Sequence, residues 1–230
     1  MRILLAALLV AFSALVGASA ARAADLPDYP DVTVPEVDYG LQGGFYLRGS
    51  AAGNMLWTRE HLGVCGCSLP PIAAGYGYSV GAGFGYEAGN GLRVDATTDY
   101  LQNDGLTDGS HVLHLRAGVA LANAYYDFGL GGDAAAGGGW GAYVGAGLGG
   151  AYYKTHVTPK TASLPDGSGF TPVVAGMAGA TYDTGSWVAD LGYRLMYLPQ
   201  ISNNRVGGTS FYLNDNTVSE IRGTIRYRLQ

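Results

Sequence analysis

The sequence predicts an all-β fold, an eight-stranded antiparallel up-and-down transmembrane β-barrel, and three observations carry this prediction. Every second residue from Trp187 to Tyr197 is apolar, while Asp190 and Arg194 lie between the apolar positions. Such alternation is typical of a strand with one apolar and one polar face, and it recurs along most of the chain. The chain also begins with an apolar, signal-like segment and is rich in Gly (38) and Tyr (17). A barrel that is apolar towards lipid and polar within accounts for all three observations.

The first 23 residues predict a secretory signal peptide. Arg2 provides the positive start, residues 3–16 are apolar, and Ala21-Arg22-Ala23 fits an A-x-A cleavage site. The apolar stretch is too short to span a bilayer comfortably, which argues against an uncleaved anchor. Residues 24–42 are acidic, contain prolines and lack periodicity, so they predict a flexible periplasmic leader. The barrel is therefore expected to occupy residues 43–230.

Eight segments show the alternation of strands, with approximate bounds. They are Gly44–Leu56, Tyr76–Ala88, Leu92–Gln102, His111–Phe128, Trp140–Tyr153, Phe170–Tyr182, Trp187–Leu198 and Val218–Leu229. Short turns at 89–91 and 183–186 and a bland Ala/Gly-rich stretch at 129–139 join them at one end. Longer connections join them at the other end, at 57–75, 103–110, 154–169 and 199–217. This asymmetry predicts short periplasmic turns and longer extracellular loops.

The parity of each strand predicts which side chains face lipid. Tyr and Trp gather at both ends of the strands, where the amphipathic rings of a membrane protein meet the headgroups. In the segment 111–128, the large apolar side chains are expected to face lipid, which turns His114 and Arg116 into the lumen. Those lipid-facing residues are Leu113, Leu115, Val119 and Leu121. The segment 170–182 fits either parity.

The predicted lumen is charged and narrow. An eight-stranded barrel is just wide enough for side chains to fill it, and buried charges are tolerated when they are paired. The inward-facing residues expected to form an ion-pair network are Arg48, Glu87, Arg93, Asp95, Asp99, Arg116, Asp190, Arg194, Glu220, Arg222 and Arg226. Inward glycines on the segments 76–88 and 140–153 are expected to leave space for the guanidinium groups. The sequence therefore predicts a closed lumen, with a narrow passive pore as the alternative.

Composition argues against several classes of function. Loss of Arg2 and Arg22 with the signal peptide changes the formal net charge from −5 to −7, whereas nucleic-acid binding needs a basic surface. The chain has no phosphate-binding loop, zinc-finger spacing or haem-attachment motif. Ser110 and His111 are adjacent, so a strand would point them to opposite faces. We expect no catalytic residues, no enzymatic activity and no dedicated metal site.

Two groups in the predicted outer loops are candidate sites. Cys65 and Cys67 are expected to form a disulfide in an oxidising compartment, with free thiols or a metal site as alternatives. All four histidines fall at the predicted outer end, and neutral imidazole ligates haem iron and transition metals. These candidate haemin or metal ligands are His61, His111, His114 and His156. The alternative is that they are ordinary polar residues of loops and rims.

Three segments resemble one family of proteins. They are Gly44–Gly49 (GFYLRG), Ala122–Phe128 (ANAYYDF) with the following Tyr143–Gly149, and Glu220–Leu229 (EIRGTIRYRL). They are similar to the small alphaproteobacterial outer-membrane β-barrels, a porin-like family of surface antigens and haemin-binding proteins with an OmpA-like barrel. The resemblance implies a structural protein of the Gram-negative outer membrane that contributes to envelope integrity and surface exposure. Its expected partners are outer-membrane lipid, lipopolysaccharide and the barrel assembly machinery, with no nucleic acid. The alternative is a surface receptor that captures haemin, the one cofactor that the resemblance suggests.

Overall fold

A computed structural model of the chain describes residues 43–62, 68–69, 75–107, 112–130, 139–158, 166–202 and 212–229. The predicted signal peptide and leader lie outside these residues, as do Cys65, Cys67, Ser110 and His111. Among the described residues, no helix is long and apolar enough to cross a membrane.

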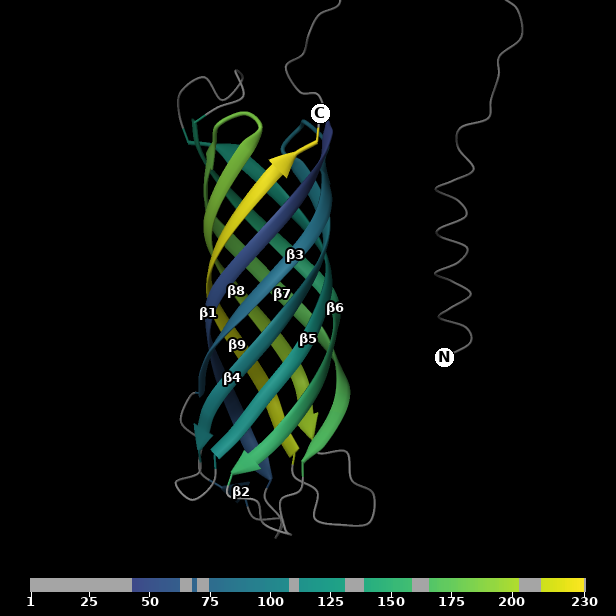
Figure 1. Cartoon of the computed structure of the whole chain (residues 1–230), viewed down its shortest axis with the longest axis vertical. Coiled ribbons are helices and arrows are strands. Elements are labelled where there is room, and N and C mark those ends of the chain that lie inside the picture. Colours follow the sequence, from purple (N-terminus) through teal and green to yellow (C-terminus); the bar gives the residue numbers. More distant parts are fainter. Residues whose placement is uncertain are drawn as a thin grey trace, which may run out of the picture. The chain divides into compact units, whose positions relative to one another are not determined.

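The described residues form one closed antiparallel barrel (Figure 1). Its long strands are β1 (Gly44–Leu62), β3 (Gly75–Glu87), β4 (Leu92–Thr107), β5 (Val112–Gly129), β6 (Gly139–Thr158), β7 (Gly167–Asp183), β8 (Trp187–Ser202) and β9 (Tyr212–Arg228). Each strand pairs with the next, and β1 pairs with β9 to close the sheet. The two-residue β2 (Ser68–Leu69) pairs with the end of β1. The predicted all-β, eight-stranded antiparallel barrel is confirmed.

The strands continue further into the predicted long loops than the sequence pattern indicated. The β1–β9 ladder, for example, continues past Leu56 to the pair Leu62 and Tyr212. Polar residues at these ends interrupt the apolar alternation, but their backbone groups still pair across the sheet. The pattern therefore marks the apolar part of each strand and misses its polar extension.

Two tight turns join strands where the sequence predicted them. Gly91 has φ of 86° after Asn90, whose Oδ1 accepts a hydrogen bond from the backbone N–H of Leu92 at 3.0 Å. Gly185 has φ of 94° in the turn between β7 and β8. Glycine adopts these left-handed conformations without steric cost, so both turns can close within a few residues.

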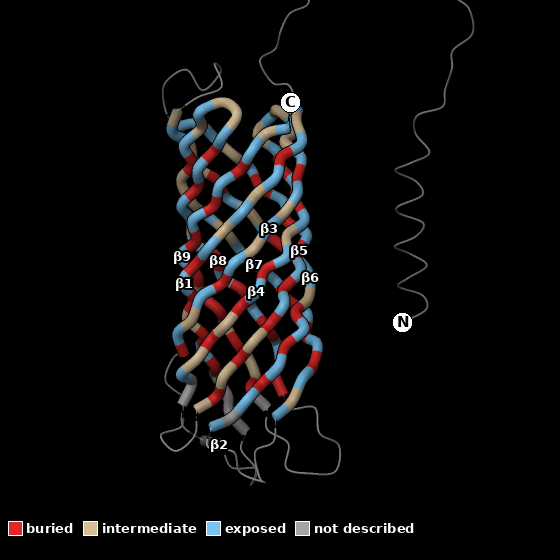
Figure 2. The backbone as a smooth tube through the Cα atoms, viewed as in Figure 1, coloured by how far each residue is buried: buried red, intermediate tan, exposed pale blue. Residues whose placement is uncertain are grey.

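Burial alternates along the strands, so that inward and outward side chains are clearly separated (Figure 2). The alternation settles the parity of β7, which the sequence left open. Thr171, Val173 and Ala175 face the interior, while Phe170 and Val174 face outwards.

The predicted orientation of β5 is wrong. Leu113, Leu115, Val119 and Leu121 are buried in the barrel interior. The outward positions are instead small residues such as Gly118 and Ala120, which share their face with His114 and Arg116. Both faces of β5 are apolar, so alternation alone could not orient it. The larger side chains face the lumen, where they make close packing contacts with other side chains. The outward face borders an apolar solvent if it lies in lipid, so it does not need large side chains.

Candidate functional site

The interior of the barrel is the candidate functional site, and ion pairs occupy its end near the short turns. Glu87 accepts hydrogen bonds from Nη1 of Arg226 and from Nε of Arg228, the latter at 2.7 Å. Arg228 also binds Asp183 at 2.6 Å, and Arg226 Nε lies 3.0 Å from Oδ2 of Asp190. Each arginine therefore bridges two carboxylates, as its planar fork allows.

A second group of charges lies further along the lumen. Asp95 accepts hydrogen bonds from the Tyr46 hydroxyl at 2.8 Å and from Nη1 of Arg48 at 2.7 Å. Arg93 binds both carboxylate oxygens of Asp127, at 2.7 and 3.0 Å. The side chains of Arg93 and Asp95 are almost completely buried, and each has an oppositely charged partner. These pairs offset the cost of removing the charges from water.

A third group links four strands near the middle of the barrel. Arg194 donates to Asp99 at 2.8 Å and to Glu220 at 2.7 Å. Arg222 contacts the same two carboxylates, at 2.7 and 2.9 Å. The Ser79 hydroxyl donates to Oε1 of Glu220 at 2.8 Å. Two arginines and two carboxylates therefore alternate in one buried square of charges.

Two interior glycines make room for tyrosine rings. A Cβ atom at Gly85 would collide with the ring of Tyr46, and one at Gly145 would collide with the ring of Tyr125. The Tyr125 ring in turn lies 4.0 Å from the guanidinium carbon of Arg93, within cation–π range. The sequence indicated that these glycines create space, but it assigned that space to guanidinium groups alone.

The other half of the lumen, towards the predicted long loops, is mainly apolar, with buried polar pairs such as Thr58–Asn216 and Asn103–Asn54 among the apolar side chains. Its buried apolar side chains form one cluster contributed by most strands of the barrel. They are Leu56, Leu101, Leu113, Leu115, Ala117, Val119, Leu121, Ala151, Tyr153, Val173, Ala175, Met196, Leu198, Ile201, Leu213 and Val218. Among the charged side chains, a cavity beside Arg48, Tyr125 and Arg194 measures 10 Å³. That is about the space that one water molecule requires. The interior is thus filled by charged pairs at one end and by mainly apolar packing at the other.

The structure brings together every residue of the predicted network except Arg116. Arg116 lies on the outer wall, where its Nη1 donates to Asp104 at 2.7 Å, because the orientation of β5 is the reverse of that predicted. Asp127, Asp183 and Arg228 are interior partners that the predicted network lacked. Asp127 and Asp183 lie at strand ends next to turns, where the alternation is interrupted, whereas Arg228 has the inward parity of its strand and was missing only from the predicted network.

The predicted histidine group is only partly assembled. His114 and His156 are paired across β5 and β6, with ring centroids 6.0 Å apart. His61 lies on β1 and pairs with Leu213 of β9, away from β5 and β6 in the strand order. The structure thus pairs two of the candidate ligands on the outer wall.

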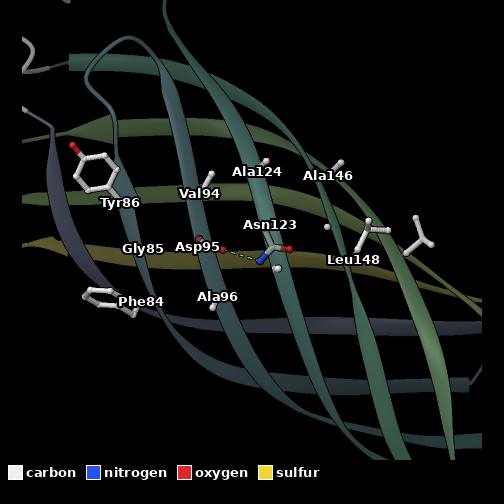
Figure 3. A pocket seen from close by; sticks show the side chains of 13 residues that line it. Phe84, Gly85, Tyr86, Val94, Asp95, Ala96, Asn123, Ala124, Ala146 and Leu148 are labelled. Atoms are coloured by element: carbon white, nitrogen blue, oxygen red, sulfur yellow. Dashed lines mark hydrogen bonds between the residues drawn. The ribbon is translucent and has the colours of Figure 1, made fainter. Parts of the chain in front are cut away.

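The outer wall also carries a shallow groove over β3 to β7 (Figure 3). Small outward residues, including Ala96, Ala124 and Ala146, form its floor, and Phe84 and Leu148 stand at its sides. On the inner side of the same wall, Asn123 donates to Asp95 at 2.7 Å. The groove is therefore an apolar feature of the outer wall.

Comparisons with known proteins establish the fold. No known protein family matches the sequence, and no curated protein matches it either. The crystal structure of Neisserial surface protein A is similar, with 19% identity and a TM-score of 0.52, over 82% of this chain and 99% of that one. OprG from Pseudomonas aeruginosa has 15% identity and a TM-score of 0.46, over 81% of this chain and 97% of that one. Ail of Yersinia pestis has 14% identity and a TM-score of 0.44, over 81% and 99%. At these identities the similarity concerns the fold of a small outer-membrane barrel, and not an activity.

Proposed function

We propose that this protein is a structural component of a Gram-negative outer membrane, a closed barrel that contributes to envelope integrity and displays its loops outside the cell. The observation that carries the proposal is the filled lumen. Ion pairs close one half, and the apolar cluster closes the other. From these two layers we infer that the described part of the lumen does not conduct solutes, so the wall and the loops carry the function.

The outer wall supports the membrane location. Large apolar side chains are exposed on this wall. Their exposure to water would be unfavourable, whereas their exposure to lipid is not. Aromatic rings occur at both ends of this apolar wall. Those near the tight turns include Tyr86, Tyr126 and Trp187, and those near the predicted outer end include Trp57, Tyr76 and Tyr152. Such rings favour the headgroup level of a bilayer.

The geometry argues against one of the two alternatives derived from the sequence, the passive pore, and favours the other, capture of a ligand. The narrow passive pore is disfavoured, because both the charged and the apolar layer block the lumen. Capture of a ligand at the outer end is a second proposal, because His114 and His156 lie side by side.

Cell fractionation and a deletion strain would test the main proposal. The protein should appear in the outer-membrane fraction, and its gel mobility should change on heating, as a folded barrel's does. Deletion should increase sensitivity to detergent and chelator, and the wild-type chain should restore resistance. The purified barrel should show no stable channel in a planar bilayer. Stable openings in the folded wild-type protein, or recovery in the soluble fraction, would contradict the proposal.

A further inference from the structure

Four polar side chains lie in a row on the outer wall, beyond the girdle residue Tyr152. They come from β4, β5, β6 and the residue just before β7, in the order Asp104, His114, His156 and Asp166. Nδ1 of His114 lies 2.7 Å from Oδ1 of Asp104, and Nδ1 of His156 lies 2.8 Å from Oδ1 of Asp166. Each imidazole is therefore anchored by a carboxylate on its far side, and the two rings face the gap between them.

These contacts determine which nitrogen of each ring is available. An ionised carboxylate can only accept hydrogen bonds, so Nδ1 of each histidine carries the proton and donates it. In a neutral imidazole, Nε2 then holds a free lone pair. The two nitrogens of the ring point in nearly opposite directions. Because the strand order places Asp104 and Asp166 on opposite sides of the pair, we infer that the Nε2 atoms of His114 and His156 are directed towards the space between the rings.

The spacing of the rings suits a shared metal ion. Imidazole nitrogens bind Zn²⁺ at about 2.0–2.1 Å, so two rings that bind one ion have centres about 5–6.5 Å apart. The centroids of His114 and His156 are 6.0 Å apart, with the ring planes inclined by 35°. Their side chains are 30% and 50% exposed, so an ion and its water ligands could reach them from solvent.

We propose that His114 and His156 bind one divalent transition-metal ion, Zn²⁺ or Cu²⁺, through Nε2, with Asp104 and Asp166 orienting the rings. Carboxylates that accept a hydrogen bond from a ligating imidazole fix its tautomer and strengthen it as a ligand. Among the described residues, no three His, Cys, Asp or Glu side chains gather around one metal position. Water therefore completes the coordination, and binding is open to exchange. This inference goes beyond the structural role, and it rests on the second proposal, ligand capture at the outer end, for which it names the ligand.

Two cations lie closer to the membrane on the same strands. Arg116 and Lys154 are paired across β5 and β6, two residues below the histidines. Arg116 shares Oδ1 of Asp104 with His114. Their positive charge opposes a bound cation, so Lys154→Gln should increase metal affinity. A site for an anionic lipid headgroup would show the reverse dependence, because it would lose a cation.

Titration of the refolded, detergent-solubilised protein with Cu²⁺ alone would test the proposal, with Zn²⁺ competition as a second measurement. We expect one ion per barrel, with two nitrogen ligands visible in the electron paramagnetic resonance spectrum. His114→Ala or His156→Ala should remove the two-nitrogen signal. Asp104→Asn should weaken binding about 10- to 100-fold, which is typical of a lost hydrogen-bond partner of a metal ligand.

Matched variants separate this site from other ligands in the chain. His61→Ala and the double change Cys65→Ser and Cys67→Ser should leave the affinity and the spectrum unchanged. Heat-modifiable gel mobility would verify that each variant is folded, and the three changed side chains of the row, Asp104, His114 and His156, lie outside the packed interior. Absence of Cu²⁺ binding, or binding that survives in both histidine variants, would overturn the proposal. So would an Asp104→Asn variant that gains affinity for inorganic phosphate and keeps its metal affinity. None of these results would affect the closed barrel.

Discussion

Arg194 shows most directly how single residues make the charged interior stable. Its side chain is 5% exposed and binds Asp99 and Glu220, which belong to different strands. Without the guanidinium group, two buried carboxylates would share Arg222 alone. An unpaired charge at such a position costs far more than the pair itself contributes.

Replacement of this arginine should therefore be severe. We expect Arg194→Met to lower the free energy of unfolding by about 3–5 kcal/mol, as for other broken buried pairs. Urea titration of the refolded barrel would measure it. Arg116→Gln is the matched control, since its pair with Asp104 is on the exposed outer wall and such pairs contribute about 0–1 kcal/mol. Equal effects of the two changes would contradict the placement of these arginines.

Gly85 provides a second test at the scale of a single residue. A methyl group there would meet the Tyr46 ring and the Cβ atom of Asp95. We expect Gly85→Ala to lower the free energy of unfolding by about 1–3 kcal/mol through overpacking. Gly49→Ala is the control, because no atom lies within 4 Å of the added Cβ, and its stability should be unchanged or slightly higher. The same urea titration would compare them, and a stable Gly85→Ala variant would argue against the tight contact with Tyr46.

At the scale of one element, β5 is a strand with two largely apolar faces. Its outward face holds Gly118 and Ala120, and its inward face holds Val119 and Leu121. On a surface that faces lipid, small apolar side chains are sufficient. The lumen, in contrast, needs larger side chains to fill its volume. Packing thus selects the orientation that the alternation of apolar residues leaves ambiguous.

Thiol labelling would test this orientation. In a chain with Cys65→Ser and Cys67→Ser, we expect Ala120→Cys to react with a lipid-soluble maleimide in vesicles, because position 120 faces lipid. Ala117→Cys should be protected, because Ala117 is 4% exposed within the packed interior. Both changes are small, so folding should persist, and gel mobility would verify it. Reversed labelling would restore the orientation first expected from the sequence.

At the scale of the whole molecule, the proposal of a closed barrel rests on two layers of the described interior, one charged and one mainly apolar. The charged layer and the apolar layer lie at different depths, so the loss of one leaves the other in place. We therefore expect the proposed closed state to survive a change in either layer alone.

A variant of one layer should therefore stay closed. We expect Arg48→Ser to give no stable conductance in a planar bilayer, although it removes the ion pair with Asp95. A large substitution in the apolar layer alone should likewise leave the charged layer as a barrier. Stable openings in the folded Arg48→Ser variant would show that the charged layer alone closes the lumen.

The sequence by itself determined the strands, the tight turns and the inward position of most charges. A strand between lipid and a lumen must separate charged from apolar side chains at every second residue, and that requirement is visible locally around residues such as Asp190 and Arg194.

Only the tertiary structure decided which charges pair, how β5 is oriented and which histidines meet. Arg194 and Asp99 are 95 residues apart in the chain, and their contact depends on how the sheet closes on itself. His114 and His156 likewise meet through the register of β5 and β6. Register and closure result from packing across the whole barrel, since each strand's own pattern is compatible with more than one neighbour and, in β5, with either face.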